Sequence, residues 1–290
     1  MSATPGIEVP HSAGTARSAL KAPPHAADCH IHIYDTRFAP RVERMEGATV
    51  AAYRLLQQRI GTSRVVIVTP RNYVTDNSVT LDAIAQLGIE NARGIAVVRP
   101  EVTDAELKRL NEAGIRGLRF TVGNPKAAVV SIDMIEPLAK RIADLGWHVQ
   151  LNMEAHQIVD NADMLKRLPT PVVFDHLGKL PPEEGTKHPA YAFICGMLDA
   201  RRAWLKISGA YLNTRVGAPL YPDATRVAQA YVKVAPERLV WGSDWPHPTP
   251  TASPDDAELF DLLSTWAPDA ATRERILVDN PETLYGFARS

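Results

Sequence analysis

Short apolar runs alternate with amphipathic segments along most of the chain. The apolar runs are rich in Val, Ile and Leu and reach at most eight residues, which is typical of parallel strands buried on both faces. This pattern predicts strands at residues 27–34, 64–70, 94–98, 114–120, 148–153, 171–176, 203–208 and 238–245.

The amphipathic segments predict helices at residues 80–88, 103–114, 132–146, 188–201 and 223–236. The second of these begins at Thr103 and has Glu106 three residues later, which is a capping-box signature. We expect the first helix, at residues 80–88, to end at Gly88, because glycine is common at the C-terminal end of a helix.

Eight strands, most of them followed by a helix, predict an α/β fold of the (β/α)8 TIM-barrel type in a single domain. The alternative is an open doubly wound sheet, which is disfavoured because no glycine-rich phosphate turn follows the first strand. We expect residues 1–24 to form a flexible N-terminal tail and residues 25–290 to form the barrel.

The composition mainly excludes classes of protein. The 290 residues are 45% hydrophobic and 22% charged, with a net charge of −1, so there is no basic field for nucleic acid. No apolar run is long enough to span a membrane, and residues 1–24 lack a targeting signal. Two distant cysteines, Cys29 and Cys195, fit a reducing cytoplasm. No interface stripe on the helices indicates an oligomeric state.

Ionisable residues gather where predicted strands end, and in a barrel this edge carries the chemistry. His30 and His32 close the first strand, and alternation puts both on one face. His176 lies at the end of the sixth predicted strand and Asp244 at the end of the eighth. Burying four such groups is costly without a reason, so we expect them to form the catalytic set.

Other polar residues at strand ends are candidates for substrate binding: Arg71, Tyr73, Thr75, Asn77, Arg119, Asn152, Tyr211 and His247. Some charged or imidazole groups fit structural roles better. We expect His148, at the start of its strand, to be structural, and Glu154 to form an ion pair with a barrel arginine. We expect Asp255 and Asp256 to lie in a solvated loop or helix start.

These motifs resemble those of the amidohydrolase superfamily, most closely its 2-pyrone-4,6-dicarboxylate lactonase-like branch. The resemblance runs from about Ala27 to near the C-terminus. It rests on the paired histidines of the first strand, His176 in "FDHLGK" and Asp244 in "GSDWPHP". The segments "ARGIAVV", "GIRGLRF", "TDNSVTLDAIA" and "DNPETLYGF" are similar too.

The resemblance implies that no cofactor is required, because the pyrone lactonase works without a bound metal. The bridging ligands of the binuclear members are missing, since Arg119 and Asn152 occupy those strand ends. If a single Zn²⁺ or Mn²⁺ binds, we expect His30, His32 and Asp244 to hold it. Arg119 matches one arginine of the dicarboxylate clamp, and Arg71 or Arg215 is expected to replace the others.

The expected function is hydrolysis of a carboxylated lactone, a small molecule from aromatic or sugar-acid breakdown. Asp244 would activate water, while His30, His32 and His176 would stabilise the oxyanion. Arg119, with Arg71, would hold the substrate carboxylate. Three alternatives remain open: a lactone isomerase of the same branch, a zinc-dependent decarboxylase of the superfamily, and a binding module without activity.

Overall fold

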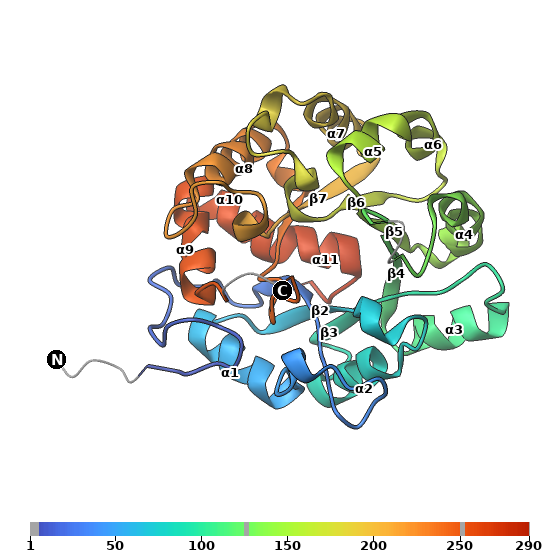
Figure 1. Cartoon of the computed structure of the whole chain (residues 1–290), viewed down its shortest axis with the longest axis horizontal. Helices are drawn as coiled ribbons and strands as arrows, with labels where there is room; N and C mark the ends of the chain where they lie inside the picture. Colours follow the sequence, from blue (N-terminus) through green and yellow to red (C-terminus); the bar gives the residue numbers. More distant parts are fainter. Residues whose placement is uncertain (1–5, 125–127, 250–252, 290) are drawn as a thin grey trace.

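All eight expected strands are present, and they pair in parallel in chain order (Figure 1). The computed structural model describes residues 6–124, 128–249 and 253–289. The strands are β1 Ala27–Ile31, β2 Arg64–Val68, β3 Ala92–Ala96, β4 Ile115–Thr121, β5 His148–Asn152, β6 Val172–Phe174, β7 Ala203–Ile207 and β8 Leu239–Trp241. The fold is therefore the expected single-domain (β/α)8 barrel.

Helices surround the sheet (Figure 1). Within the described residues they are α1 Val50–Ile60, α2 Ser78–Leu87, α3 Asp104–Glu112, α4 Ile135–Ile142, α5 Ala155–Asp160, α6 Ala162–Arg167, α7 Pro189–Asp199, α8 Pro222–Val234, α9 Asp256–Trp266, α10 Ala270–Glu274 and α11 Asn280–Tyr285. All five predicted helices are present. Thr103 caps α3 by accepting from the Glu106 amide at 3.1 Å, but the Glu106 carboxylate pairs with Arg109 instead of completing the capping box.

Hydrogen bonds between β1 and the segment after β8, together called the clasp below, close the barrel. Asp28 accepts hydrogen bonds from the Ser243 amide at 2.9 Å and the Ser243 hydroxyl at 2.6 Å. The amide of Asp244 donates to the His30 carbonyl at 2.8 Å, and that of His32 donates to the Trp245 carbonyl at 2.8 Å. The clasp therefore places the last strand's carboxylate beside the first strand's histidines.

An irregularity in β1 directs its histidines into the barrel mouth. The register against β2 shifts between Asp28 and Ile31, as at a β-bulge. Cys29 packs in the apolar cluster with Val66 and Val240, whereas His30 belongs to the polar layer above it. Bulges beside active sites commonly redirect side chains in this way.

The C-terminal segment packs against the opposite end of the barrel. Tyr285 and Phe287 belong to the same apolar cluster as Cys29. Arg93 donates to the carbonyls of Tyr285 and Gly286, at 3.1 and 2.7 Å. That end is therefore filled, and the strands are accessible for chemistry at their carboxyl ends.

The expected N-terminal tail lies against the barrel over much of its described length. Trp245 donates from Nε1 to the Pro10 carbonyl at 2.8 Å, and Asp256 donates from its amide to Ser12 Oγ at 3.2 Å. The buried Arg59 donates to the carbonyls of Ala13 and Ala16. This segment is therefore packed on the outside of the loop that carries Asp244. None of the helices in the described ranges has the length and apolar character that crossing a membrane requires.

Candidate active site

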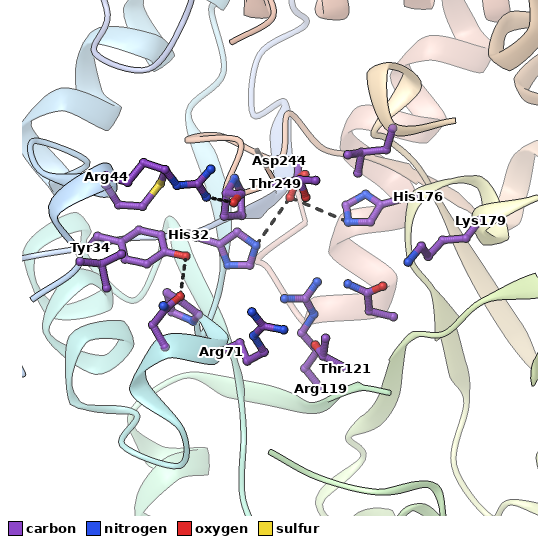
Figure 2. Close-up of a pocket in the computed structure, with 17 residues that line it drawn as sticks. His32, Tyr34, Arg44, Arg71, Arg119, Thr121, His176, Lys179, Asp244 and Thr249 are labelled. Atoms are coloured by element: carbon purple, nitrogen blue, oxygen red, sulfur yellow. Dashed lines mark hydrogen bonds and ion pairs between the residues drawn. The ribbon is translucent and has the colours of Figure 1, made fainter. Parts of the chain in front are cut away.

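The four predicted catalytic side chains lie together at the mouth of the barrel, and Figure 2 shows three of them, His32, His176 and Asp244. Asp244 Oδ1 is 3.5 Å from His30 Nε2, 3.6 Å from His32 Nε2 and 3.8 Å from His176 Nε2. All four residues are buried. One carboxylate oxygen therefore faces three imidazoles, two from β1 and the residue that directly follows it and one from the segment after β6.

Two of these residues occupy unusual backbone conformations. His176 has φ 48° and Asp244 has φ 65°, both in the left-handed region that residues with a Cβ rarely adopt. Such conformations cluster at functional sites, where the surrounding structure holds them in place. Here the amide of Asp244 is fixed by the His30 carbonyl.

The ring nitrogen that points away from Asp244 is also fixed in each histidine. His32 Nδ1 lies 2.8 Å from the Val68 carbonyl, and His176 Nδ1 lies 2.9 Å from Ser208 Oγ. His30 Nδ1 lies 3.3 Å from Lys206 Nζ. Each ring therefore has a set orientation before any substrate binds.

Beneath the imidazoles lies a fully buried charged network. Asp175 Oδ2 accepts from Arg119 Nε at 3.3 Å and from Gln150 Nε2 at 3.2 Å. Lys206 Nζ donates to Gln150 Oε1 at 2.8 Å and lies 3.8 Å from Asp175 Oδ1. Burial lowers the pKa of Lys206 to about 8, against the opposing charge of Asp175. Burial also acts to raise the pKa of Asp175, but His30 and Lys206 outweigh it and hold that pKa well below its usual value.

Burial and neighbouring charges also shift the pKa values of His30, His176 and Asp244. Burial lowers the pKa of His30 well below its usual value, and Lys206 adds to the effect. Burial also lowers the pKa of His176. For Asp244 burial acts to raise the pKa, but the adjacent imidazoles outweigh it and the pKa lies below the usual range. His30 and His176 are therefore neutral beside an ionised carboxylate, which is able to accept hydrogen bonds.

A cavity of about 530 Å³ opens above these groups. Its walls carry four cationic side chains: Arg44, Arg71, Arg119 and Lys179 (Figure 2). Arg44 donates to the Pro248 carbonyl, and Lys179 pairs with Glu154. Asn152 also lines the cavity. The volume suits a small organic molecule, and the lining suits an anionic one.

Tyr211 touches the catalytic layer from the side. Its hydroxyl donates to Asp244 Oδ2 at 2.6 Å, while Asp244 Oδ1 faces the imidazoles. Burial raises the pKa of Tyr211 well above its usual value, and the charge of Asp244 adds to this shift. The phenol therefore remains a donor, and its contact is with Asp244 instead of with the cavity.

Besides Tyr211, four predicted substrate-binding residues do not line the main cavity. Tyr73 packs on Tyr34, and its hydroxyl accepts from the Asp35 amide at 3.2 Å. Thr75 is exposed. The side chains of the other two point into the protein. Asn77 donates from Nδ2 to the Val97 carbonyl and accepts at Oδ1 from the Val97 amide. His247 Nε2 lies 3.2 Å from Asp256 Oδ2, and both residues are buried.

Residues expected to be structural are placed as follows. His148 is buried, with its ring edge-on to Tyr285. Glu154 forms an ion pair, but with Lys179 instead of an arginine. Asp255 caps α9 and pairs with Arg59 at 2.6 Å, whereas Asp256 is fully buried and not solvated. Arg215, expected to assist in carboxylate binding, is exposed and pairs with Glu183.

The predicted catalytic and substrate-binding sets did not include Asp175, Lys206, Gln150 or Ser208, although Lys206 and Ser208 lie at the end of the seventh predicted strand. Asp175 precedes His176 directly, and Lys206 is a charged residue inside an otherwise apolar strand. A charge within a buried strand needs a partner, so this signal was available in the sequence. Arg44 and Lys179 carried no comparable signal, because they lie in short 3-10 turns outside the predicted strands and helices.

A metal site was tested against this arrangement. Ligand atoms of His30, His176 and Asp244 lie within 4.8 Å of one another, so His176 replaces the expected His32 in the group that forms. Metal ligation requires a free lone pair on each imidazole nitrogen. Lys206 Nζ, which is a donor, lies 3.3 Å from His30 Nδ1, and Asp175 Oδ1, which is an acceptor, lies 3.4 Å from the same nitrogen. His30, His176 and Asp244 are the residues that would hold a single divalent metal, and we derive no step through one.

Comparisons with known proteins agree with this geometry. A family model described as amidohydrolase matches residues 27–287. The chain is 34% identical to a 2-pyrone-4,6-dicarboxylate hydrolase of Comamonas testosteroni, over 94% of both chains. It is 31% identical to a 4-sulfomuconolactone hydrolase of Rhizobium radiobacter and 30% identical to a D-galactarolactone isomerase of Agrobacterium fabrum, each over 91% of both chains.

A solved apo structure from Agrobacterium tumefaciens superposes with a TM-score of 0.83 at 28% identity, covering 97% of this chain and 99% of that one. The match of the family model spans the whole barrel, from β1 to the segment after α11. The chain is therefore a member of the amidohydrolase family, in its pyrone-dicarboxylate lactonase-like branch.

Proposed function

We propose that the protein is a lactonase, which opens the ring of a carboxylated lactone by attack of water on the lactone carbonyl. The observation that carries this proposal is Asp244 Oδ1 facing three imidazoles at the floor of a cavity with cationic walls. The relatives that are named as hydrolases of a pyrone dicarboxylate and a sulfomuconolactone support it.

Asp244 is the general base in this reaction. Its carboxylate is ionised, buried and held by the Tyr211 hydroxyl, so it can accept a proton from a water molecule above it. A positioned base of this kind contributes about 10²–10⁴-fold to the rate. The protonated Asp244 then returns the proton to the alkoxide that leaves as the ring opens.

The imidazoles bind the oxygen atoms that react. The Nε2 atoms of His30, His32 and His176 lie 3.5, 3.6 and 3.8 Å from Asp244 Oδ1, so they would surround a carbonyl group attacked by water at Asp244. Donors fixed in place for a developing oxyanion are worth about 10²–10³-fold each. The reaction is proposed to use these groups of the chain and no resident metal.

Arg119 and Arg71 hold the substrate carboxylate. Arg119 is the better fixed of the two, because its Nε bonds to Asp175 and the rest of the guanidinium lines the cavity. Arg71 follows β2 directly, on an exposed part of the wall. Guanidinium groups bind carboxylates through paired hydrogen bonds, which orients the ring as well as retaining it.

The function is tested with a panel of muconolactones, pyrone dicarboxylate and aldonolactones, with acid release followed by a pH indicator. The Asp244→Asn variant should lose at least about 10²-fold in kcat on any active lactone, because it removes the base and keeps the shape. Substrate affinity should change little. Asp199→Asn, on an exposed position of α7, is the matched control. Normal kcat in Asp244→Asn would exclude the role of Asp244.

The absence of a resident metal is tested separately. Extended dialysis against a chelator should leave kcat/KM unchanged. A loss of activity that Zn²⁺ or Mn²⁺ restores would overturn this part of the proposal.

A second function is favoured by the relative named as a galactarolactone isomerase. An isomerase uses the same carbonyl activation but delivers a hydroxyl of the substrate instead of water. Product analysis in ¹⁸O-labelled water separates the two. Hydrolysis places one labelled oxygen in the new carboxylate, whereas isomerisation leaves the product unlabelled.

A further inference from the structure

We propose that Lys206 is a positioning residue that keeps the proton of His30 on Nε2, so that His30 and His32 present opposite hydrogen-bonding atoms to the substrate. The two rings are neighbours, with centroids 5.1 Å apart, and both direct Nε2 at Asp244. Their outer nitrogens, however, meet groups of opposite character.

His32 Nδ1 meets a carbonyl. The oxygen of Val68 lies 2.8 Å away and is able only to accept, so the proton of a neutral His32 sits on Nδ1. Its Nε2 then carries a lone pair toward the cavity. This is the usual way in which a backbone carbonyl selects the tautomer of a histidine.

His30 Nδ1 meets an ammonium group. Lys206 Nζ has three N–H donors and no acceptor. Two donors are engaged by the carbonyl of Cys29 and by Gln150 Oε1, both at 2.8 Å, and the third is directed to His30 Nδ1 at 3.3 Å. The lone pair of His30 is thus on Nδ1 and its proton is on Nε2.

Asp175 offers the competing arrangement. Its Oδ1 lies 3.4 Å from His30 Nδ1, but in the described structure this oxygen has no hydrogen-bond partner. Its Oδ2 is held by Arg119 and Gln150. Without the Lys206 ammonium, Oδ1 would be the only acceptor beside Nδ1, and the proton of His30 would move to that side.

The two tautomers give His30 and His32 different roles in the reaction, and this assignment of roles rests on the proposed lactonase function. His30 Nε2 is buried, has no hydrogen-bond partner among the described residues and lies 3.5 Å from Asp244 Oδ1, so its N–H would donate to the carbonyl oxygen of a substrate that binds against Asp244. His32 Nε2, with its lone pair, accepts a hydrogen bond from the attacking water. Lys206 touches neither molecule and acts through His30.

The tautomers are measured directly by long-range ¹H–¹⁵N NMR of the ¹⁵N-labelled full-length protein without substrate. His30→Gln and His32→Gln variants assign the two rings. We expect the Nε2–H pattern for His30 and the Nδ1–H pattern for His32. A Nδ1–H pattern for His30 in the unmodified protein would overturn the proposal, whether or not any variant folds.

The Lys206→Met variant tests the cause. We expect His30 to change to the Nδ1–H form and the affinity for Zn²⁺, measured by competition with a chromophoric chelator, to rise at least tenfold. Lys140→Met, on the exposed face of α4, is the matched control and should change neither property. An unchanged His30 tautomer in a folded Lys206→Met variant would contradict the proposal.

Kinetics separates this inference from the proposed function. If the lactonase assignment holds, Lys206→Met should reduce kcat by about 10²-fold, as expected for the loss of one oxyanion donor. If no lactone is turned over, the proposed function fails while the tautomer spectra still decide the role of Lys206.

Discussion

At the scale of single residues, each carboxylate oxygen of Asp244 has its own neighbours. Oδ1 faces the imidazoles, and Oδ2 accepts a hydrogen bond from the Tyr211 hydroxyl. Its bond to Oδ2 is 2.6 Å long. Tyr211→Phe should reduce kcat about tenfold with a smaller change in KM, because the base keeps its charge but loses its fixed orientation. Steady-state kinetics measures both. Tyr191→Phe, on α7, is the control, and a Tyr211→Phe variant with unchanged kcat would remove Tyr211 from this role.

The sequence identified the residues whose position in an element already implied their direction. His30, His32, His176 and Asp244 follow or end strands, and strand ends of a barrel meet in one place. The layer beneath was harder to predict. Whether Lys206 points inward depends on the register of β7 in the barrel. Its partner Gln150 comes from β5, and its partner Asp175 directly follows β6. Such contacts follow from the closed sheet and are not encoded in local spacing.

At the scale of elements, the clasp between β1 and β8 both closes the barrel and places the base. Asp28→Ala would leave the Ser243 amide and hydroxyl and the His30 amide without their shared acceptor. Buried donors without partners are costly, so the free energy of unfolding should fall by about 2–4 kcal/mol. Denaturant titration measures this change. Asp28→Asn, which keeps one acceptor oxygen, should lose less, and exposed Asp199→Ala should lose almost nothing.

Strand positions were predictable because buried parallel strands are nearly continuous apolar runs. The ends of the strands were less predictable. The apolar runs at 171–176 and 238–245 extend beyond β6 and β8, because the last residues of each run leave the sheet and form the site. The shift of register in β1 had no local signal, since it arises from the fit to β2 and β8. Helices α1 and α9 were not singled out, although α9 begins at the Asp255 cap.

At the scale of the whole molecule, buried imidazoles link stability to pH. Burial lowers the pKa of His148 to about 3. An unfolded chain carries this histidine at its ordinary pKa of about 6.5, so below that pH the unfolded state binds a proton that the folded state rejects. Stability from His148 is therefore intact above about pH 6.5 and is lost progressively as the pH falls toward 3.

His148→Gln removes this titration and should flatten the pH dependence of unfolding. Between pH 7.5 and pH 5, the unmodified protein should lose about 2 kcal/mol more than the variant. Other buried groups titrate in the same range, among them Asp28, whose pKa burial raises to about 7. The comparison therefore uses the difference between two proteins that share those groups. His156→Gln, at an exposed position of α5, controls for the loss of a histidine, and it should keep the unmodified slope. Equal slopes for His148→Gln and the unmodified protein would mean that His148 is protonated in the folded barrel, which its burial opposes because the described structure leaves its Nε2 without a hydrogen-bond partner.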